Sequence, residues 1–156
     1  MNYPVIPDVM IEKREEASAR QYNLTKPRGS MGDLEALSID IAGMTGKIAP
    51  KLGNRSVFLM AADHGIAREG VSPYPSEVTA QMVMNFLNHG AAINVLTKQA
   101  HSEVRIVDVG VAVDLPESEG LILKKVAYGT ANMLNDPAMT REQAEAALQV
   151  GMDVLN

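Results

Sequence analysis

The feature that most constrains the fold of this chain is an abrupt change of character after residue 62. Residues 57–62 form a short, uninterrupted apolar run, whereas residues 63–76 are polar and interrupted by glycine and proline. A short run without alternation is typical of a strand buried on both faces, as in a parallel sheet. In open α/β sheets, ligands bind at the carboxyl ends of the strands. The polar segment therefore predicts a functional site directly after the strand.

A helix is expected after the polar segment, and a second strand after that. Ser76 stands where a helix N-cap residue should. Apolar residues recur behind it at helical spacing, at Val78, Met82, Val83, Phe86 and Leu87. Residues 104–109 predict the second strand, with Asp108 and Gly110 at its end, and the connection is long enough for a right-handed crossover. We therefore expect residues 56–62 and 104–109 to be adjacent parallel strands whose polar ends share one edge.

Residues 1–50 are expected to be helical. Asp8 is the expected cap of a first helix that runs to about Tyr22, with acidic residues near its start and Arg20 near its end. This charge order favours the helix dipole. A second helix, closed by Gly46 and Pro50, carries an apolar stripe. The stripe consists of Leu34, Leu37, Ile41, Met44 and Ile48.

The turn between these two helices is a candidate anion site. Lys26 and Arg28 are basic, and Gly29 lets the backbone adopt turns that other residues resist. Such a turn, running through Ser30, exposes backbone amides that can hold an anion. The alternative is that the segment simply connects two helices.

The last third of the chain adds a short strand and a helix. Residues 121–126 predict a third strand, and Thr140 with Gln143 forms a capping box for the last helix. Parallel sheets usually carry several strands and are covered on both faces. The pattern therefore indicates either a small sheet or the amino-terminal part of a larger protein. In the second case, the last helix should present Leu148, Met152 and Leu155 to a poorly covered surface.

The composition argues against several classes of function. The 156 residues carry a formal net charge of −5 and no basic cluster, which argues against nucleic-acid binding. No apolar run approaches the roughly 20 residues of a membrane span, and the amino terminus lacks the regions of a signal peptide. Because there is no cysteine, disulfides and thiolate metal sites are excluded. A reducing cytoplasm is the expected location.

Asp63 and His64 are the candidate polar residues at the end of the first strand. They could act as an acid–base pair, ligate a metal or stabilise the turn, although neighbours on a turn seldom point at one atom. His89 and His101 lie at expected helix ends, where solvated side chains are more usual than ligands. The sequence contains no nucleophile elbow, Walker-type phosphate loop or dinucleotide fingerprint. The three interpretations of Asp63 and His64 therefore stay open.

Eight short motifs, taken in order, resemble the nicotinate-nucleotide–dimethylbenzimidazole phosphoribosyltransferase family. They occupy residues 25–35, 62–65, 70–72, 78–83, 90–96, 107–110, 129–132 and 137–140. Each motif alone is weak, but their order is specific, and the similarity extends over roughly residues 20–155. One departure is Asp33, where the family commonly has arginine after the glycine.

The resemblance implies an α/β fold, a Rossmann-like parallel sheet with helices on both faces, together with a small helical domain. Residues 1–50 would belong to the small domain, and residues 51–156 to the amino-terminal half of the Rossmann-like domain. The family forms homodimers and transfers phosphoribose from nicotinate mononucleotide to 5,6-dimethylbenzimidazole or a related base. The product is the α-ribazole phosphate of the cobalamin lower loop. No metal and no cofactor are implied.

The resemblance also assigns site residues by position. Tyr74 and Met82 resemble residues that line the aromatic-base pocket, and Asp63, His64 and Ser72 are candidates for the edge of the site. The alternative is that Tyr74 and Met82 pack in the core.

Catalysis is expected to need more than this chain. The family's catalytic glutamate and its glycine-rich phosphate-binding segment lie beyond Asn156, so the chain alone is expected to be catalytically incomplete. A second hypothesis is a non-catalytic fragment or subunit that supplies the base pocket to a partner.

Overall fold

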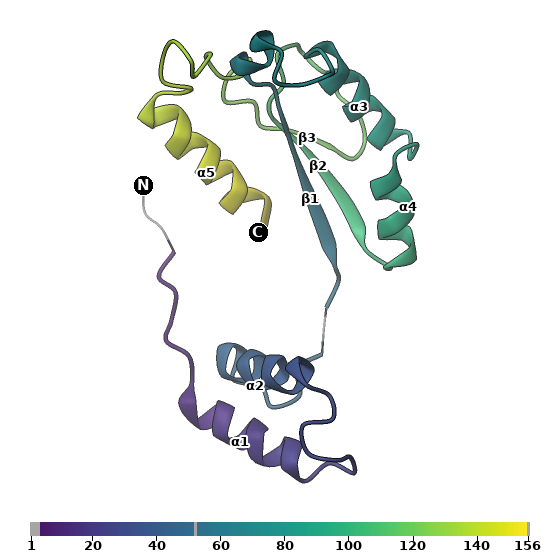
Figure 1. The fold of residues 1–156 in the computed structure, drawn as a ribbon, viewed down its shortest axis with the longest axis vertical. Helices are drawn as coiled ribbons and strands as arrows, with labels where there is room; N and C mark the ends of the chain where they lie inside the picture. The colour runs from purple at the N-terminus through teal and green to yellow at the C-terminus, as the bar shows by residue number, and fades with distance from the viewer. Residues whose placement is uncertain (1–3, 52, 156) are drawn as a thin grey trace. The chain divides into compact units, whose positions relative to one another are not determined.

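The computed structural model describes residues 4–51 and 53–155. The chain divides into two compact units, Met1–Gly53 and Asn54–Asn156. The first unit contains two helices, and the second contains a three-stranded parallel sheet with helices against both of its faces (Figure 1).

The first unit is a pair of helices, α1 (Ile11–Tyr22) and α2 (Asp33–Thr45). The two helices contact each other through small residues, because Ala17 and Ala42 are buried. A Cβ atom on Gly43 would lie 2.6 Å from the side chain of Arg14, so glycine is needed where the helices meet.

The helix ends of this unit agree only in part with the sequence pattern. The predicted Asp8 cap is wrong, since α1 begins at Ile11 and Met10 occupies the N-cap position. The backbone amide of Met10 donates to the carbonyl of Gly43 at 3.0 Å, which fastens the chain to α2 before the helix begins. Gly46 ends α2 as predicted, with a left-handed φ of 69°.

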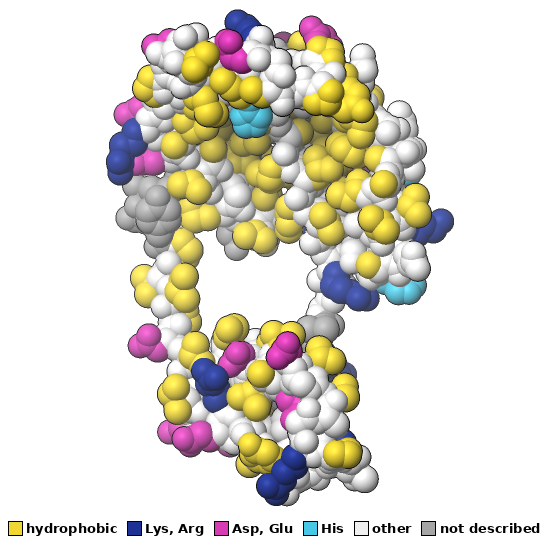
Figure 2. Space-filling model, in the orientation of Figure 1, with side chains coloured by type: hydrophobic (Ala, Val, Ile, Leu, Met, Phe, Trp, Pro, Cys, Tyr) yellow, Lys and Arg dark blue, Asp and Glu magenta, His cyan; other side chains and the backbone are white. Residues whose placement is uncertain are grey.

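The predicted apolar stripe of α2 is not the surface that packs on α1. Leu34, Leu37 and Met44 are 59%, 53% and 65% exposed. Figure 2 accordingly shows hydrophobic side chains on the surface of both units. Exposed apolar side chains that share one face of a helix can mark a place where other protein binds.

The second unit is built on a parallel sheet of order β1-β2-β3. β1 (Ser56–Ala62) pairs with β2 (Glu103–Gly110), and β2 pairs with β3 (Leu121–Leu123). The prediction of adjacent parallel strands is confirmed. The third strand is shorter than the predicted 121–126, although the backbone amide of Val126 still donates to the carbonyl of Val109 at 3.0 Å.

Helices cover both faces of this sheet. The β1–β2 connection contains α3 (Glu77–Leu87) and α4 (Ala92–Gln99), and the last helix is α5 (Arg141–Leu155). One core cluster contains Ala61, Val83, Ile106, Val111 and Leu115, and the other contains Val107, Val150 and Val154. Successive strand residues point to opposite faces, which sends Ile106 toward α3 and Val107 toward α5. The predicted fold class is confirmed.

The helix starts in this unit lie where the sequence places them. Ser76 occupies the N-cap position of α3, but its side chain makes no capping hydrogen bond. The capping box before α5 is formed: the amide of Gln143 donates to Thr140 Oγ1 at 3.2 Å, and the amide of Thr140 donates to Gln143 Oε1 at 2.8 Å. On α5, Leu148 and Leu155 are 54% and 71% exposed, as predicted, whereas Met152 is half-buried.

Within the part of the chain that the structure describes, no helix combines the length and the apolar character that a membrane crossing requires.

Candidate functional site at the carboxyl edge of the sheet

The polar ends of β1 and β2 meet at one edge of the sheet, as predicted. The backbone amide of Asp63 donates to the carbonyl of Gly110 at 2.9 Å, and Ala62 pairs with Gly110 across an irregularity in the ladder. Pairing therefore continues one residue past β1 and brings the two predicted turns into contact.

The carboxylate of Asp63 holds these turns together. The side chain is 7% exposed, and its Oδ2 accepts a hydrogen bond from the amide of Ala112 at 2.7 Å. The carbonyl of Asp63 accepts from the amide of Thr130 at 3.1 Å. Of the three interpretations of this residue, these contacts favour the turn stabiliser.

His64 lies at the opening of the site. Its side chain is exposed, and its backbone is extended, with φ −128° and ψ 126°. It directly precedes the short 3₁₀ helix η1 (Gly65–Glu69), whose C-cap residue Gly70 has a left-handed φ of 73°. The imidazole is thus available to a ligand bound at this edge.

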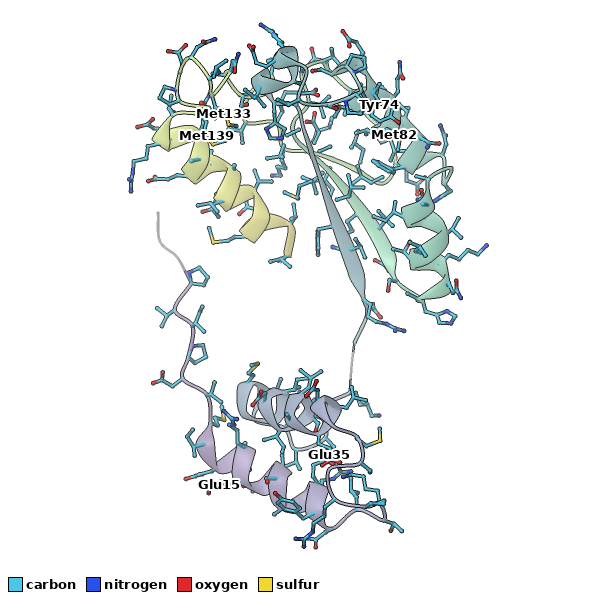
Figure 3. The ribbon with its side chains drawn as sticks, in the orientation of Figure 1. Glu15, Glu35, Tyr74, Met82, Met133 and Met139 are labelled. Carbon is cyan, nitrogen blue, oxygen red and sulfur yellow. The ribbon has the colours of Figure 1, made fainter. Side chains whose placement is uncertain are left out.

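A groove of about 490 Å³ opens between the end of β1, η1 and the first turns of α3. It brings together all five residues predicted for the base pocket and the site edge, which are Asp63, His64, Ser72, Tyr74 and Met82. Figure 3 shows Tyr74 and Met82 on the α3 side of β1. The volume falls within the range of roughly 300–1,000 Å³ found for small-ligand clefts.

The walls of this groove are mostly apolar. They include Leu59, Ile66, Ala67, Val71, Val78 and Phe86. Tyr74 is 68% exposed, so it does not pack in the core, and its backbone amide donates to Ser72 Oγ at 3.2 Å. Met82 is 36% exposed, at the boundary between wall and surface. Such walls suit a flat aromatic ligand, with the tyrosine hydroxyl as a polar handle.

A second cavity, of about 460 Å³, lies at the ends of β2 and β3. Asp108 is one of its lining residues; it is fully buried, and its Oδ1 accepts from the amide of Val111 at 2.8 Å. Lys125 Nζ lies 2.9 Å from Asp108 Oδ2 and also donates to the carbonyls of Val111 and Val113. The hydroxyl of Tyr128 donates to Asp114 Oδ1 at 2.7 Å, and this contact raises the pKa of Tyr128.

No pattern in the sequence predicted the partner of Asp108. The only signal was a lysine pair directly after the short third strand, and nothing in that pattern says that Lys125 turns inward. Its ammonium group is matched by one carboxylate and two carbonyls, so the cluster supports the loops more readily than it binds a ligand.

The predicted anion turn lies in the first unit. Lys26 Nζ lies 2.5 Å from Glu35 Oε1, and the amide of Met31 donates to the same oxygen at 3.2 Å. The Lys26 contact, and after it the Met31 amide, lower the pKa of Glu35. Gly29 has a φ of 73°, and Ser30 is exposed in the same turn. An anion would have to displace Glu35 to reach Lys26, so anion binding here stays a prediction.

Metal ligation gains no support from the described residues. Across residues 4–51 and 53–155, no group of three or more His, Asp or Glu side chains is placed to hold a metal ion.

Comparison with known proteins defines the class of protein to which this fold and groove belong. A family model described as phosphoribosyltransferase matches residues 6–156, so the chain belongs to this phosphoribosyltransferase family.

Relatives with high identity to this chain carry a more specific name. The nicotinate-nucleotide–dimethylbenzimidazole phosphoribosyltransferase of Roseiflexus sp. (strain RS-1) is 56% identical over 140 residues, which are 90% of this chain and 40% of the relative. The enzyme of the same name from Geobacter sulfurreducens is 50% identical over 145 residues, 93% of this chain and 41% of the relative. The resemblance drawn from the eight motifs is confirmed.

A solved structure agrees with these relatives. The crystal structure of the nicotinate-nucleotide–dimethylbenzimidazole phosphoribosyltransferase from Thermus thermophilus superposes with a TM-score of 0.88 at 46% identity. The match covers 92% of this chain and 44% of that one. The chain therefore spans less than half the length of the proteins it resembles.

Proposed function

We propose that this chain carries the base-binding groove of a nicotinate-nucleotide–dimethylbenzimidazole phosphoribosyltransferase. The complete enzyme would transfer phosphoribose from nicotinate mononucleotide to 5,6-dimethylbenzimidazole or a related base and form α-ribazole phosphate. The observation that carries the proposal is the apolar groove that joins Tyr74 and Met82 at the carboxyl end of a parallel strand. We further propose that the enzyme works in the cytoplasm as a homodimer.

The groove is suited to hold the acceptor base rather than to perform the transfer. The unprotonated ring nitrogen of the base attacks the anomeric carbon as nicotinate leaves, and a carboxylate takes the proton from the other ring nitrogen. Asp63 is the one carboxylate among the residues that line the groove, and its Oδ2 already accepts the Ala112 amide. We therefore expect the proton acceptor to come from outside the groove, and the chain alone to bind base without turnover.

The residues of the groove suggest how the base is selected. The Tyr74 hydroxyl offers a hydrogen-bond handle, and Met82 offers a flexible, polarisable wall. Recognition by stacking and shape should dominate over hydrogen bonding to the far edge of the base. The groove should therefore accept substitutes for dimethylbenzimidazole.

A second candidate function is a non-catalytic subunit that supplies this groove to a partner polypeptide. It is favoured by the exposed apolar side chains of α2 and α5, since Leu34, Met44 and Leu155 are each more than half exposed. Further polypeptide packed on these helices would remove that surface from water.

Equilibrium dialysis of 5,6-dimethylbenzimidazole against the 156-residue chain tests the proposal. We expect saturable binding at one site and no release of nicotinate from added nicotinate mononucleotide. Tyr74→Ser should weaken this binding. Tyr128→Ser is its matched control, because Tyr128 is 62% exposed and lines the second cavity instead. Absence of saturable binding, or binding that depends on Tyr128 and not on Tyr74, would refute the proposal. Turnover by the chain alone would show that the proton acceptor lies within it.

A further inference from the structure

The 3₁₀ helix η1, which forms one wall of the groove, is held at both ends by a single loop. At its first residue, the amide of Gly65 donates to the carbonyl of Thr130 at 3.1 Å and to Thr130 Oγ1 at 3.2 Å. At its last residue, Glu69 Oε1 accepts from Asn132 Nδ2 at 2.6 Å. The loop, residues 129–132, comes from the segment between β3 and α5. We call it the clamp loop.

The clamp loop packs directly on the backbone of η1. A Cβ atom on Gly65 would lie 2.6 Å from the carbonyl carbon of Ala131 and 2.6 Å from the amide nitrogen of Asn132. Gly129 has a φ of 84°, and a Cβ there would lie 3.2 Å from the carbonyl oxygen of Asp63. Both glycines therefore permit a backbone-to-backbone approach that side chains would prevent.

The side chains of η1 are not anchored in the core of the unit. None of its residues is buried, and Ile66 and Ala67 face the groove. The segment that follows Gly70 carries Tyr74, which is largely exposed. The position of this wall, and of Tyr74 beyond it, therefore depends on the contacts at the two ends of η1.

The side-chain amide of Asn132 serves two purposes. Its Oδ1 accepts from the amide of Leu134 at 3.1 Å, which shapes the clamp loop, and its Nδ2 donates to Glu69. The orientation of the amide is fixed by these partners, since one is a donor and the other an acceptor. Asn132 therefore links the shape of the loop to the position of η1.

We propose that the clamp loop positions the wall of the base groove from the opposite side of the sheet, and that Asn132 is a positioning residue that acts through Glu69. Figure 3 shows Met133, next to this residue, and Met139 on the α5 side of β1, opposite Tyr74 and Met82. Asn132 is not among the residues that line the groove. The effect on base binding rests on the proposed function, whereas the effect on η1 does not.

Asn132→Asp tests the link with little change of shape. An aspartate keeps the oxygen that accepts from Leu134 but sets a carboxyl group against Glu69. We expect the affinity for 5,6-dimethylbenzimidazole to fall about fivefold, because the charge-assisted hydrogen bond is replaced by repulsion. Glu69→Gln keeps an acceptor for Asn132 and should bind base like the parent chain. In Asn132→Asp combined with Glu69→Lys, an ion pair should restore affinity to within about twofold.

Hydrogen exchange of the chain without ligand gives an independent readout. The amide of Ala67 donates to the carbonyl of His64 and that of Gly70 to the carbonyl of Ala67, at the two ends of η1. The amide of Ala144 donates to the carbonyl of Thr140 at the start of α5. We expect Asn132→Asp to speed exchange at Ala67 and Gly70, and the addition of Glu69→Lys to slow it again. Exchange at Ala144 should stay unchanged in both variants.

The two readouts separate the possible failures. Unchanged exchange at Ala67 and Gly70 in Asn132→Asp would overturn the proposed clamp, as would a double variant, Asn132→Asp with Glu69→Lys, in which these amides exchange as fast as in Asn132→Asp alone. Faster exchange together with unchanged base affinity would overturn the positioning role. If the parent chain binds no base while η1 responds as expected, the proposed function fails and the clamp on η1 stands.

Discussion

The groove beside β1 and the cavity beside β2 and β3 are nearly equal in size, about 490 and 460 Å³, and both lie at carboxyl ends of neighbouring strands. They differ in what their polar groups do. In the cavity, Asp108 and Lys125 neutralise each other and Tyr128 donates to Asp114. In the groove, Tyr74 and His64 are exposed beside apolar walls. If the groove is the base site that we propose, the dense polar cluster is structural support and its less charged neighbour receives the ligand.

Removing the charge partner in the cavity should have the largest effect. Lys125→Met leaves the fully buried Asp108 unpaired, and we expect a loss of about 3 kcal/mol in the free energy of unfolding. Urea denaturation followed by circular dichroism measures it. Asp108→Asn added to Lys125→Met should recover part of the loss, because no buried charge is then left unpaired. If Lys125→Met keeps its stability but loses base binding, the roles of the two cavities are reversed.

The stability of the groove wall formed by η1 should depend on close backbone packing and not on a charge pair. Gly65→Ala places a Cβ atom 2.6 Å from the clamp loop, so we expect a loss of about 2 kcal/mol in unfolding free energy and weaker base binding. Gly151→Ala is the matched control, since its Cβ meets nothing within 4 Å in α5. That variant should stabilise the chain by about 0.5 kcal/mol. Equal effects of the two substitutions would contradict the close packing at Gly65.

The side chains of the groove should affect affinity and leave stability nearly unchanged. Tyr74→Ser removes the aromatic wall, and we expect about tenfold weaker binding of 5,6-dimethylbenzimidazole. Met82→Gln should shift the preference toward bases with a polar far edge. Met133→Gln is the control, since Met133 is 58% exposed and outside the groove.

A complete enzyme carrying this half allows competition between dimethylbenzimidazole and single-ring acceptors. If Tyr74→Ser and Met82→Gln leave the product ratio unchanged, the two residues do not determine base choice.

The smallest effect concerns the titration of Tyr128. Its phenol donates to Asp114, so its pKa in the folded chain is raised, and this contact stabilises the fold fully below the ordinary tyrosine pKa of about 10. The stabilisation is lost as the pH rises through the raised pKa. Asp114→Asn should lower the pKa toward its ordinary value, as measured by phenolate absorbance. Base binding should not change, because Tyr128 lies outside the groove.

Local sequence patterns predicted much of this architecture. The apolar run before Asp63 predicted β1, and the capping box of Thr140 and Gln143 predicted the start of α5, because each depends on residues close in sequence. The ends of strands and helices were less well determined. Asp8 failed as a cap because a hydrogen bond between Met10 and Gly43 fixes the chain at another point.

Only the tertiary structure decided which polar groups of the site are used in hydrogen bonds within the fold and which side chains are exposed. The Asp63 carboxylate bonds to an amide 49 residues away, and the amide of Gly65 bonds to Thr130, 65 residues away. No periodicity reports such pairs, because they arise when β2 and the β3–α5 segment pack against the end of β1. The sequence by itself determined that a parallel strand would end in a polar site. Packing determined that Asp63 would support that site and that Tyr74 would line the groove while remaining largely exposed.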